Sequence, residues 1–217
     1  MISIDIVSDP VCPWCFIGKR RLERAIAGRP EYRFQVGWRP FQLNPDMPRA
    51  GMERQQYLSL KFGGRERAFK TYAHVSKAGE DEGIPFRFEA IRRQPNTFDA
   101  HRLIRWSGTA GRQDAVVETL FRRYFEEGCD IGDRNTLAAV AGEAGMDAAQ
   151  VKAWLEDEVD SDVVREEETI ARRMGIGGVP CFIVDRRFAV SGAQDPSVLV
   201  NVLDLAMKEK GAVQAAE

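Results

Sequence analysis

Apolar and polar residues alternate at the start of the chain with the two-residue period of a β-strand, from residue 2 to residue 7. Over residues 12–27 the period becomes helical, and Gly28 and Pro30 end that pattern. Residues 32–38 alternate again. The opening segment therefore predicts a strand–helix–strand unit, in which two parallel strands are joined by a right-handed crossover.

The long middle of the chain follows the helical period almost throughout. Asn96, Asp133 and Asp147 are residues of the type that cap helix N-termini. Strand patterns return at residues 181–184, which are apolar without a break, and at residues 188–190. A last helix is expected from Asp195 onward. The helices predicted before that point lie near residues 53–62, 68–75, 96–104, 116–125, 137–144, 151–155 and 163–174.

The predicted elements run βαβ, then a helical block, then ββα. Because neither outer segment can complete a sheet alone, the simplest account is that they pair with each other. The fold class predicted is α/β, a thioredoxin fold split by a large all-helical insertion. We expect a discontinuous thioredoxin-like domain of residues 1–50 and 166–217, with the helical insertion at residues 51–165.

Two cysteines stand where the first strand gives way to the first helix, in the sequence Cys12-Pro13-Trp14-Cys15. This spacing beside a strand–helix–strand pattern predicts a redox dithiol. The helix N-terminus favours a thiolate at Cys12, and the thiolate is the attacking form of a cysteine. Cys15 lies one turn on, where it can resolve a mixed disulfide. Pro13 suits a first helical turn, and Trp14 is expected to be exposed and to contact a partner.

A zinc half-site is the alternative interpretation of this cysteine pair. Such a site usually needs a second Cys or His pair. Cys129 and Cys181 are isolated, and the histidines are only His74 and His101, so the spacing favours redox chemistry. Cys129 and Cys181 are predicted to be small buried residues rather than further redox thiols. Asp9 is a candidate proton acceptor for the pair, although Asp-Pro is more typical of a turn.

A glycine-rich segment precedes the third predicted strand and ends in Gly178-Val179-Pro180. A proline in this position suits a cis peptide bond, although only about 5% of X–Pro bonds in folded proteins are cis. The predicted fold is what raises the expectation here. A cis bond would leave the Val179 backbone open at the sheet edge facing Cys12, where a substrate backbone could pair with it.

Composition narrows the class of protein further. The chain has 217 residues, of which 44% are apolar, and its formal net charge is −2. Paired arginines are offset by acidic runs, so no nucleic-acid partner is predicted. No apolar run is long enough to span a membrane and no signal peptide is visible, so no membrane partner is expected. We expect a cytoplasmic protein whose dithiol is kept reduced.

These motifs together resemble a known family. The Cys12 to Cys15 motif and Gly178-Val179-Pro180, placed around a helical insertion, are similar to the DsbA-like branch of the thioredoxin superfamily. Within that branch the chain resembles the FrnE-like group, which is related to 2-hydroxychromene-2-carboxylate isomerases and kappa-class glutathione transferases. The segments that carry this closer likeness are residues 38–45 (WRPFQLNP), 96–103 (NTFDAHRL) and 191–194 (SGAQ).

The resemblance implies thiol–disulfide oxidoreductase activity. It implies that Cys12 is the nucleophile, Cys15 the resolving thiol and Pro180 the cis-proline. It also implies that Asn96, Thr97 and His101 border the substrate groove. Pro13, Trp14 and Val179 are the other expected substrate contacts. No metal or bound cofactor is expected, and glutathione is a candidate co-substrate. The expected partner is a disulfide-bearing protein or a small thiol, and a homodimer stays open.

Two other functions are kept as alternatives. One is a glutathione-dependent isomerase or transferase acting on a small aromatic or polyketide-like compound, in which Cys12 would only position glutathione. Those relatives typically carry serine in place of Cys12, and a glutathione site needs no resolving thiol, so the presence of Cys15 favours the oxidoreductase. The other is a non-catalytic binding or holdase protein. The direction of electron flow stays open, because reduction potentials in this fold span about −270 to −120 mV.

Overall fold

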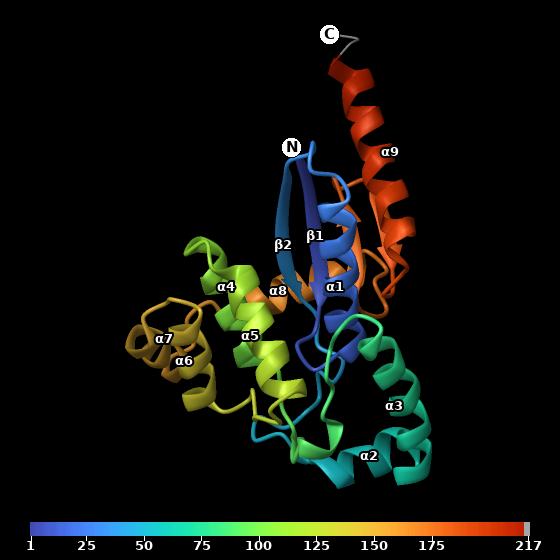
Figure 1. Cartoon of the computed structure of the whole chain (residues 1–217). Helices are drawn as coiled ribbons and strands as arrows, with labels where there is room; N and C mark the ends of the chain where they lie inside the picture. The colour runs from blue at the N-terminus through green and yellow to red at the C-terminus, as the bar shows by residue number, and fades with distance from the viewer. Residues whose placement is uncertain (215–217) are drawn as a thin grey trace.

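A four-stranded sheet forms the centre of the computed structural model, which describes residues 1–214 (Figure 1). The strand order is β2-β1-β5-β6. β1 (Ile2–Ser8) and β2 (Phe34–Pro40) are parallel, as the crossover rule predicts. β5 (Cys181–Val184) runs antiparallel to β1, and β6 (Phe188–Ser191) antiparallel to β5. The two ends of the chain therefore build one sheet, which confirms the predicted thioredoxin fold.

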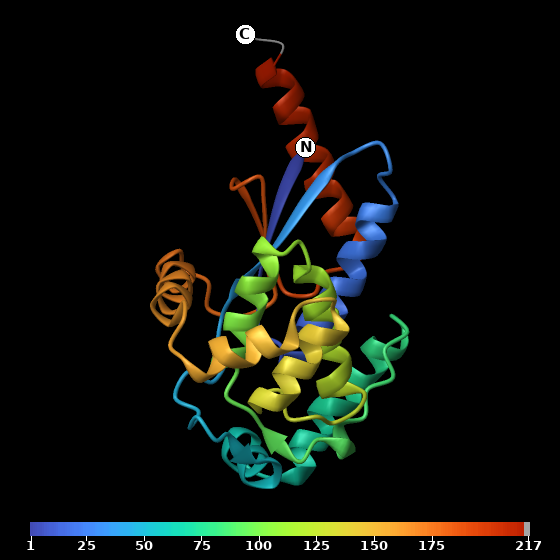
Figure 2. The same ribbon diagram turned by 90° about the vertical axis from the view of Figure 1, so that its left-hand side faces the viewer.

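Helices from both ends of the chain cover this sheet. α1 (Pro13–Ala27) joins β1 to β2 and packs beside α9 (Pro196–Gln214). α8 (Ser161–Arg173) contacts β2. The first turn of α1 lies at the end of the sheet that faces the insertion, and α9 extends beyond the opposite end (Figures 1 and 2).

The insertion is helical as predicted, apart from one short strand pair. β3 (Met52–Glu53) and β4 (Arg93–Gln94) are antiparallel, and strands of two residues are too short to show an alternating pattern. α8 runs without a break across residues 165 and 166, where we placed the boundary of the insertion. The other elements of the insertion are α2 (Arg54–Phe62), α3 (Arg65–Glu80), the 3-10 helix Phe88–Ala90, α4 (Phe98–Thr109), α5 (Gln113–Phe125), α6 (Arg134–Glu143) and α7 (Ala148–Glu156).

One hydrophobic core runs through both parts of the molecule. Phe16 of α1 stacks on Phe121 of α5, with ring centroids 4.9 Å apart, and meets Phe86 edge-on at 6.1 Å. Because α1 shares its buried face with the insertion, the helix that carries the cysteines is fixed from both sides. The insertion therefore helps to position the dithiol.

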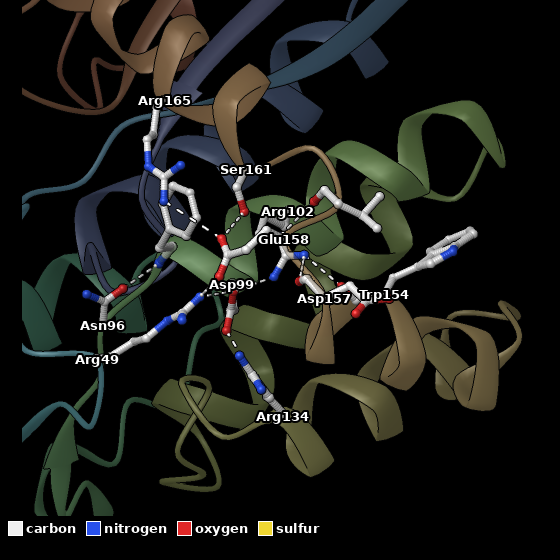
Figure 3. A network of polar contacts seen from close by, with 12 residues as sticks. Arg49, Asn96, Asp99, Arg102, Arg134, Trp154, Asp157, Glu158, Ser161 and Arg165 are labelled. Atoms are coloured by element: carbon white, nitrogen blue, oxygen red, sulfur yellow. Dashed lines mark hydrogen bonds and ion pairs between the residues drawn. The ribbon is translucent and has the colours of Figure 1, made fainter.

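A fully buried arginine fastens the α7–α8 connection to α4 (Figure 3). Arg102 donates to Asp99 Oδ1 at 2.8 Å, one helical turn away. Its other N–H groups donate to three backbone carbonyls, those of Trp154 at 2.6 Å, Asp157 at 2.5 Å and Val159 at 2.9 Å. The guanidinium thus binds two carbonyls at the C-terminal end of α7, where helices leave such groups unpaired, and one in the connection to α8.

The predicted cap of α4 is one residue early. Thr97 occupies the N-cap position, with no capping bond from its side chain. Asn96 Oδ1 accepts a hydrogen bond from the Phe98 N–H at 2.9 Å, which closes a local turn before the helix begins. In the part of the chain that the structure describes, no helix combines the length and apolar character needed to cross a membrane.

Candidate active site

Cys12 is the N-cap residue of α1, and Pro13 is the first residue of the helix. The Cys12 carbonyl accepts the Cys15 N–H at 3.0 Å, which sets the second sulfur one turn beyond the first. Both cysteines are free thiols, and their exposed fractions are 4% and 1%. Proline is tolerated in a first helical turn, so Pro13 can begin the helix directly after Cys12. The dithiol therefore lies at the helix N-terminus, which carries partial positive charge.

Cys15 is the more deeply buried of the two thiols. Burial raises the pKa of Cys15 well above its usual range, and the neighbouring Cys12 sulfur raises it further. The Ser8 hydroxyl and the Asp9 backbone form hydrogen bonds that oppose this shift. Cys15 is therefore a thiol at neutral pH and must give up a proton before it can attack another sulfur.

The cis Val179–Pro180 peptide bond lies against Cys12. The Cys12 thiol donates to the Val179 carbonyl oxygen, with 3.6 Å between sulfur and oxygen. Gly18 permits this approach, because a Cβ there would lie 3.0 Å from Pro180 Cγ and 3.1 Å from Phe182 Cζ. Pro180 is buried and Val179 half-buried. The structure thus brings together residues from the two ends of the chain.

Trp14 is half-buried, whereas we expected it to be exposed. Its ring packs on His74 of α3, with centroids 5.6 Å apart. The hydrophobic pattern could not show that an insertion helix would cover this side of the motif. Pro13 beside it is also half-buried.

Asp9 lies fully buried beneath the dithiol, at 0% exposure. Its carbonyl accepts the Cys12 N–H at 2.9 Å, and its carboxyl oxygens accept the N–H groups of Leu43 at 2.7 Å and Val11 at 3.4 Å. Burial raises the pKa of Asp9 to about 7, against the lowering effect of these donors. Asp9 is therefore more than a turn residue, because it carries a titratable proton next to two cysteines.

The resemblance implied that His101 borders the substrate groove. In the structure its side chain lies in the interior instead. Its imidazole is buried, and Nε2 lies 3.8 Å from Asp9 Oδ1 without a hydrogen-bond partner. Burial lowers the pKa of His101 to about 4, so the ring is neutral at pH 7. His101 thus lies in the interior beside Asp9, with 3% of its surface exposed.

The side chain of Asn96 forms its hydrogen bonds with the backbone of Met47 and Phe98. Its Nδ2 donates to the Met47 carbonyl at 2.6 Å, and the residue lines cavities that none of the cysteines line. The neighbouring Thr97 makes the contact with the site, through a hydrogen bond from its side chain to Asp9. A substrate contact at Asn96 stays a prediction, and Thr97 is the neighbouring residue that bonds to Asp9.

The sequence also gave no sign of Arg54 and Tyr72. Arg54 is buried and donates to the Tyr72 hydroxyl at 2.7 Å, and no carboxylate among residues 1–214 forms an ion pair with it. Burial raises the pKa of Tyr72, and the negative charge of a Cys12 thiolate would add to this rise, so Tyr72 lies near the Cys12 sulfur. Both residues line a cavity of about 1000 Å³ that includes Phe69 of α3, whose exposed fraction is 75%. A lone arginine at the start of a short helix belongs to no sequence motif, so its contact with Tyr72 could not be predicted from the sequence.

The two remaining cysteines lie outside this arrangement. Cys181 is buried at the start of β5, and burial raises its pKa. Cys129 is half-buried in the connection between α5 and α6, where its N–H donates to the Arg123 carbonyl at 2.8 Å. Full burial was predicted for both thiols and holds for Cys181 alone.

Comparison with known proteins identifies the family. The sequence matches the DSBA-like thioredoxin domain over residues 3–204. The chain belongs to this family. A crystal structure of a probable DsbA oxidoreductase from Streptomyces coelicolor is 33% identical, has a TM-score of 0.87, and is matched over 96% of our chain and 91% of that one. The resemblance inferred from the cysteine and proline motifs is thereby confirmed.

More distant solved structures share the fold with this chain. A 2-hydroxychromene-2-carboxylate isomerase is 17% identical with a TM-score of 0.69, over 99% of our chain and 98% of that chain. The cytosolic disulfide reductase DsbM from Pseudomonas aeruginosa, solved with GSH, is 18% identical with a TM-score of 0.64, over 95% and 99%.

Proposed function

We propose that this DsbA-like protein is a thiol–disulfide oxidoreductase that works through the Cys12–Cys15 dithiol. The observation that carries the proposal is the position of the Cys12 sulfur, at a helix N-terminus and 3.6 Å from the Val179 carbonyl. The helix end favours the thiolate that attacks a disulfide, and the backbone at Val179 offers an edge for the substrate chain. Membership of an oxidoreductase family supports the same chemistry.

The reaction proceeds in two exchanges. The Cys12 thiolate attacks one sulfur of the substrate disulfide, the S–S bond breaks, and one substrate thiolate leaves. Cys15 then loses its proton and attacks the Cys12 sulfur of the mixed disulfide. The second substrate thiolate leaves as the Cys12–Cys15 disulfide forms. Two electrons pass from the dithiol to the substrate, and the reverse sequence oxidises a substrate dithiol.

Asp9 is the proposed acceptor of the Cys15 proton. It contacts both cysteines through its backbone and is buried with them, so solvent is a poor competitor for the proton. A carboxyl with a pKa of about 7 can both take and return a proton near neutral pH. Asp9 would therefore serve the exchange in either direction.

The proposed substrate is a disulfide-bearing protein or a small disulfide, in the cytoplasm, with no bound cofactor and no nucleic-acid or membrane partner. Glutathione is the proposed co-substrate if the protein works as a reductase. The likeness to a cytosolic reductase solved with GSH motivates this choice, although that name describes the other protein. A homodimer is compatible with the proposal.

A trapping experiment tests the function. Cys15→Ala should stall at the mixed disulfide and retain whatever Cys12 attacks, whereas Cys12→Ala should trap little because Cys15 is 1% exposed. Mass spectrometry of adducts purified from cells then identifies the substrate class. Protein adducts released by reductant support the proposal. Equal trapping by both variants, or none by Cys15→Ala, contradicts it.

A glutathione-dependent isomerase is the second candidate, favoured by the fold shared with 2-hydroxychromene-2-carboxylate isomerase. The purified protein should therefore be offered a protein disulfide and an aromatic isomerase substrate side by side. Activity on the aromatic compound alone, unchanged in Cys15→Ala, would replace the first proposal with this one. Turnover of a model disulfide that requires Cys12 would argue against a purely binding or holdase role.

A further inference from the structure

The hydrogen bonds around His101 determine which ring nitrogen carries its proton. The imidazole bonds to the backbone of Phe41. The Phe41 N–H already donates to the Ser8 carbonyl at 3.2 Å, so the group that remains for the ring is the Phe41 carbonyl, which can only accept. Because Nε2 has no partner, Nδ1 is the nitrogen that donates. In the neutral ring, Nε2 is then an acceptor with a free lone pair.

This lone pair faces a carboxyl group. Nε2 lies 3.8 Å from Asp9 Oδ1, and both groups are buried. The separation is longer than a hydrogen bond, and a movement of about 1 Å would bring the two atoms within bonding distance. An ionised Asp9 has no proton to offer, so the acceptor stays unsatisfied. A protonated Asp9 can donate to Nε2, so the pair is complementary when the carboxyl holds a proton.

The other groups around Asp9 come from several elements and act differently. The backbone N–H groups of Val11 and Leu43 and the Thr97 side chain donate to the carboxyl and favour its ionised form. Against them, Glu168 of α8 disfavours ionisation through its charge. The titratable neighbours that share this buried region are Cys12, the N-cap residue of α1, with Cys15 of α1, Tyr57 of α2 and Tyr124 of α5. His101 differs from the donors, because it supplies an acceptor for the protonated form.

We propose that His101 is a positioning residue for the redox reaction: its neutral Nε2 accepts a hydrogen bond from Asp9 once that carboxyl has taken the Cys15 proton. This inference rests on the proposed function of the dithiol. In the resolving step the Cys15 S–H bond breaks, its proton passes to the Asp9 carboxylate, and the Cys15 sulfur forms the bond to Cys12 as the substrate thiolate leaves. The reverse step returns the proton from Asp9 to the Cys15 thiolate.

Nitrogen NMR of the wild-type protein tests the tautomer directly. The chain has only two histidines, so the ring resonances can be assigned with one substitution at His74. His101 should be neutral from pH 5.5 to pH 8, with the proton on Nδ1, and its Nε2 resonance should shift in one transition near pH 7 as Asp9 titrates. A proton on Nε2 would overturn the inference, as would an Nε2 signal that does not respond to pH. This measurement needs no catalytic activity.

Two substitutions of His101 test the contributions of its two ring nitrogens separately. His101→Gln can place an acceptor near the Nε2 position, whereas His101→Asn can keep a donor near Nδ1 but offers Asp9 nothing. The readout is the rate at which Cys15 resolves a preformed mixed disulfide, measured from pH 5 to pH 9. Removing an acceptor of the protonated form lowers the pKa of Asp9, so the midpoint in His101→Asn should fall by about one pH unit. His101→Gln should stay closer to the wild type.

The outcomes distinguish this inference from the proposed function. If Cys15 does not resolve mixed disulfides in the wild type, the proposed function fails, and the NMR result still decides the tautomer. If resolution occurs but both folded variants keep the wild-type midpoint, the role of His101 is refuted. Thermal unfolding of each variant is the control, because a general loss of structure would lower its Tm. If the variants do not fold, the wild-type NMR titration decides.

Discussion

Replacing Arg102 with methionine should be among the most damaging single changes in the chain. Methionine fills a similar volume but carries no donor, so it removes the four hydrogen bonds that the guanidinium makes to Asp99 and to three backbone carbonyls (Figure 3). The side chain of Asp99 is only 10% exposed, and it would keep only weak partners, Arg134 at 3.5 Å and Arg49 at 4.0 Å. The substitution therefore leaves a largely buried carboxylate poorly compensated.

Breaking a buried ion pair by removing one partner typically costs about 3–5 kcal/mol. The upper half of that range applies here, because three carbonyls lose their donor as well. For a chain of this size about 4 kcal/mol corresponds to a fall in Tm of roughly 10 °C. The assay is urea unfolding followed by circular dichroism, with thermal unfolding as a second measure. Arg49→Met is the matched control, since Arg49 is 57% exposed and its removal should cost less than about 1 kcal/mol.

A double substitution sharpens this test. Arg102→Met combined with Asp99→Leu removes the stranded carboxylate, so it should be less destabilised than Arg102→Met alone. The reasoning would be refuted if Arg102→Met unfolded within about 1 kcal/mol of the wild type. It would also be refuted if the double variant lost the sum of the two single costs, because the two side chains would then act independently.

Two further predictions concern the site. Gly18→Ala should destabilise the protein by about 1–3 kcal/mol and slow disulfide exchange, because the new Cβ would meet Pro180 and Phe182 at 3.0–3.1 Å; Gly211→Ala, where a Cβ meets nothing within 4 Å, is the control. The pKa of Asp9 is raised on folding, so its ionisation lowers stability progressively between about pH 4 and pH 7. Asp9→Asn should therefore gain about 4 kcal/mol in unfolding free energy at pH 8 and little at pH 4 while its resolving step slows, and an equal gain at both pH values would contradict the assignment.

The parts of the site that the sequence revealed depend on local rules combined with topology. The dithiol could be placed at a helix N-terminus because an alternating strand gives way directly to a helical period at Cys12. The approach of Val179 to Cys12 followed from pairing the first predicted strand with the third. Both predictions depended on strand and helix periods, which repeat along the chain and are therefore visible in the sequence. They needed no knowledge of how the insertion packs.

The contacts of Asp9 required that knowledge, and the pattern of α4 could not supply it. Polar and apolar residues are buried on nearly every side of this helix, so its periodicity does not distinguish a core face from a solvent face. His101 and Arg102 are adjacent and both buried, yet one meets a carboxyl beneath the dithiol and the other meets carbonyls at the C-terminal end of α7. A buried polar side chain needs partners, and their identity depends on which distant segment is brought opposite to it. Buried polar residues without a local partner are therefore the positions from which the chemistry of such a site should be sought.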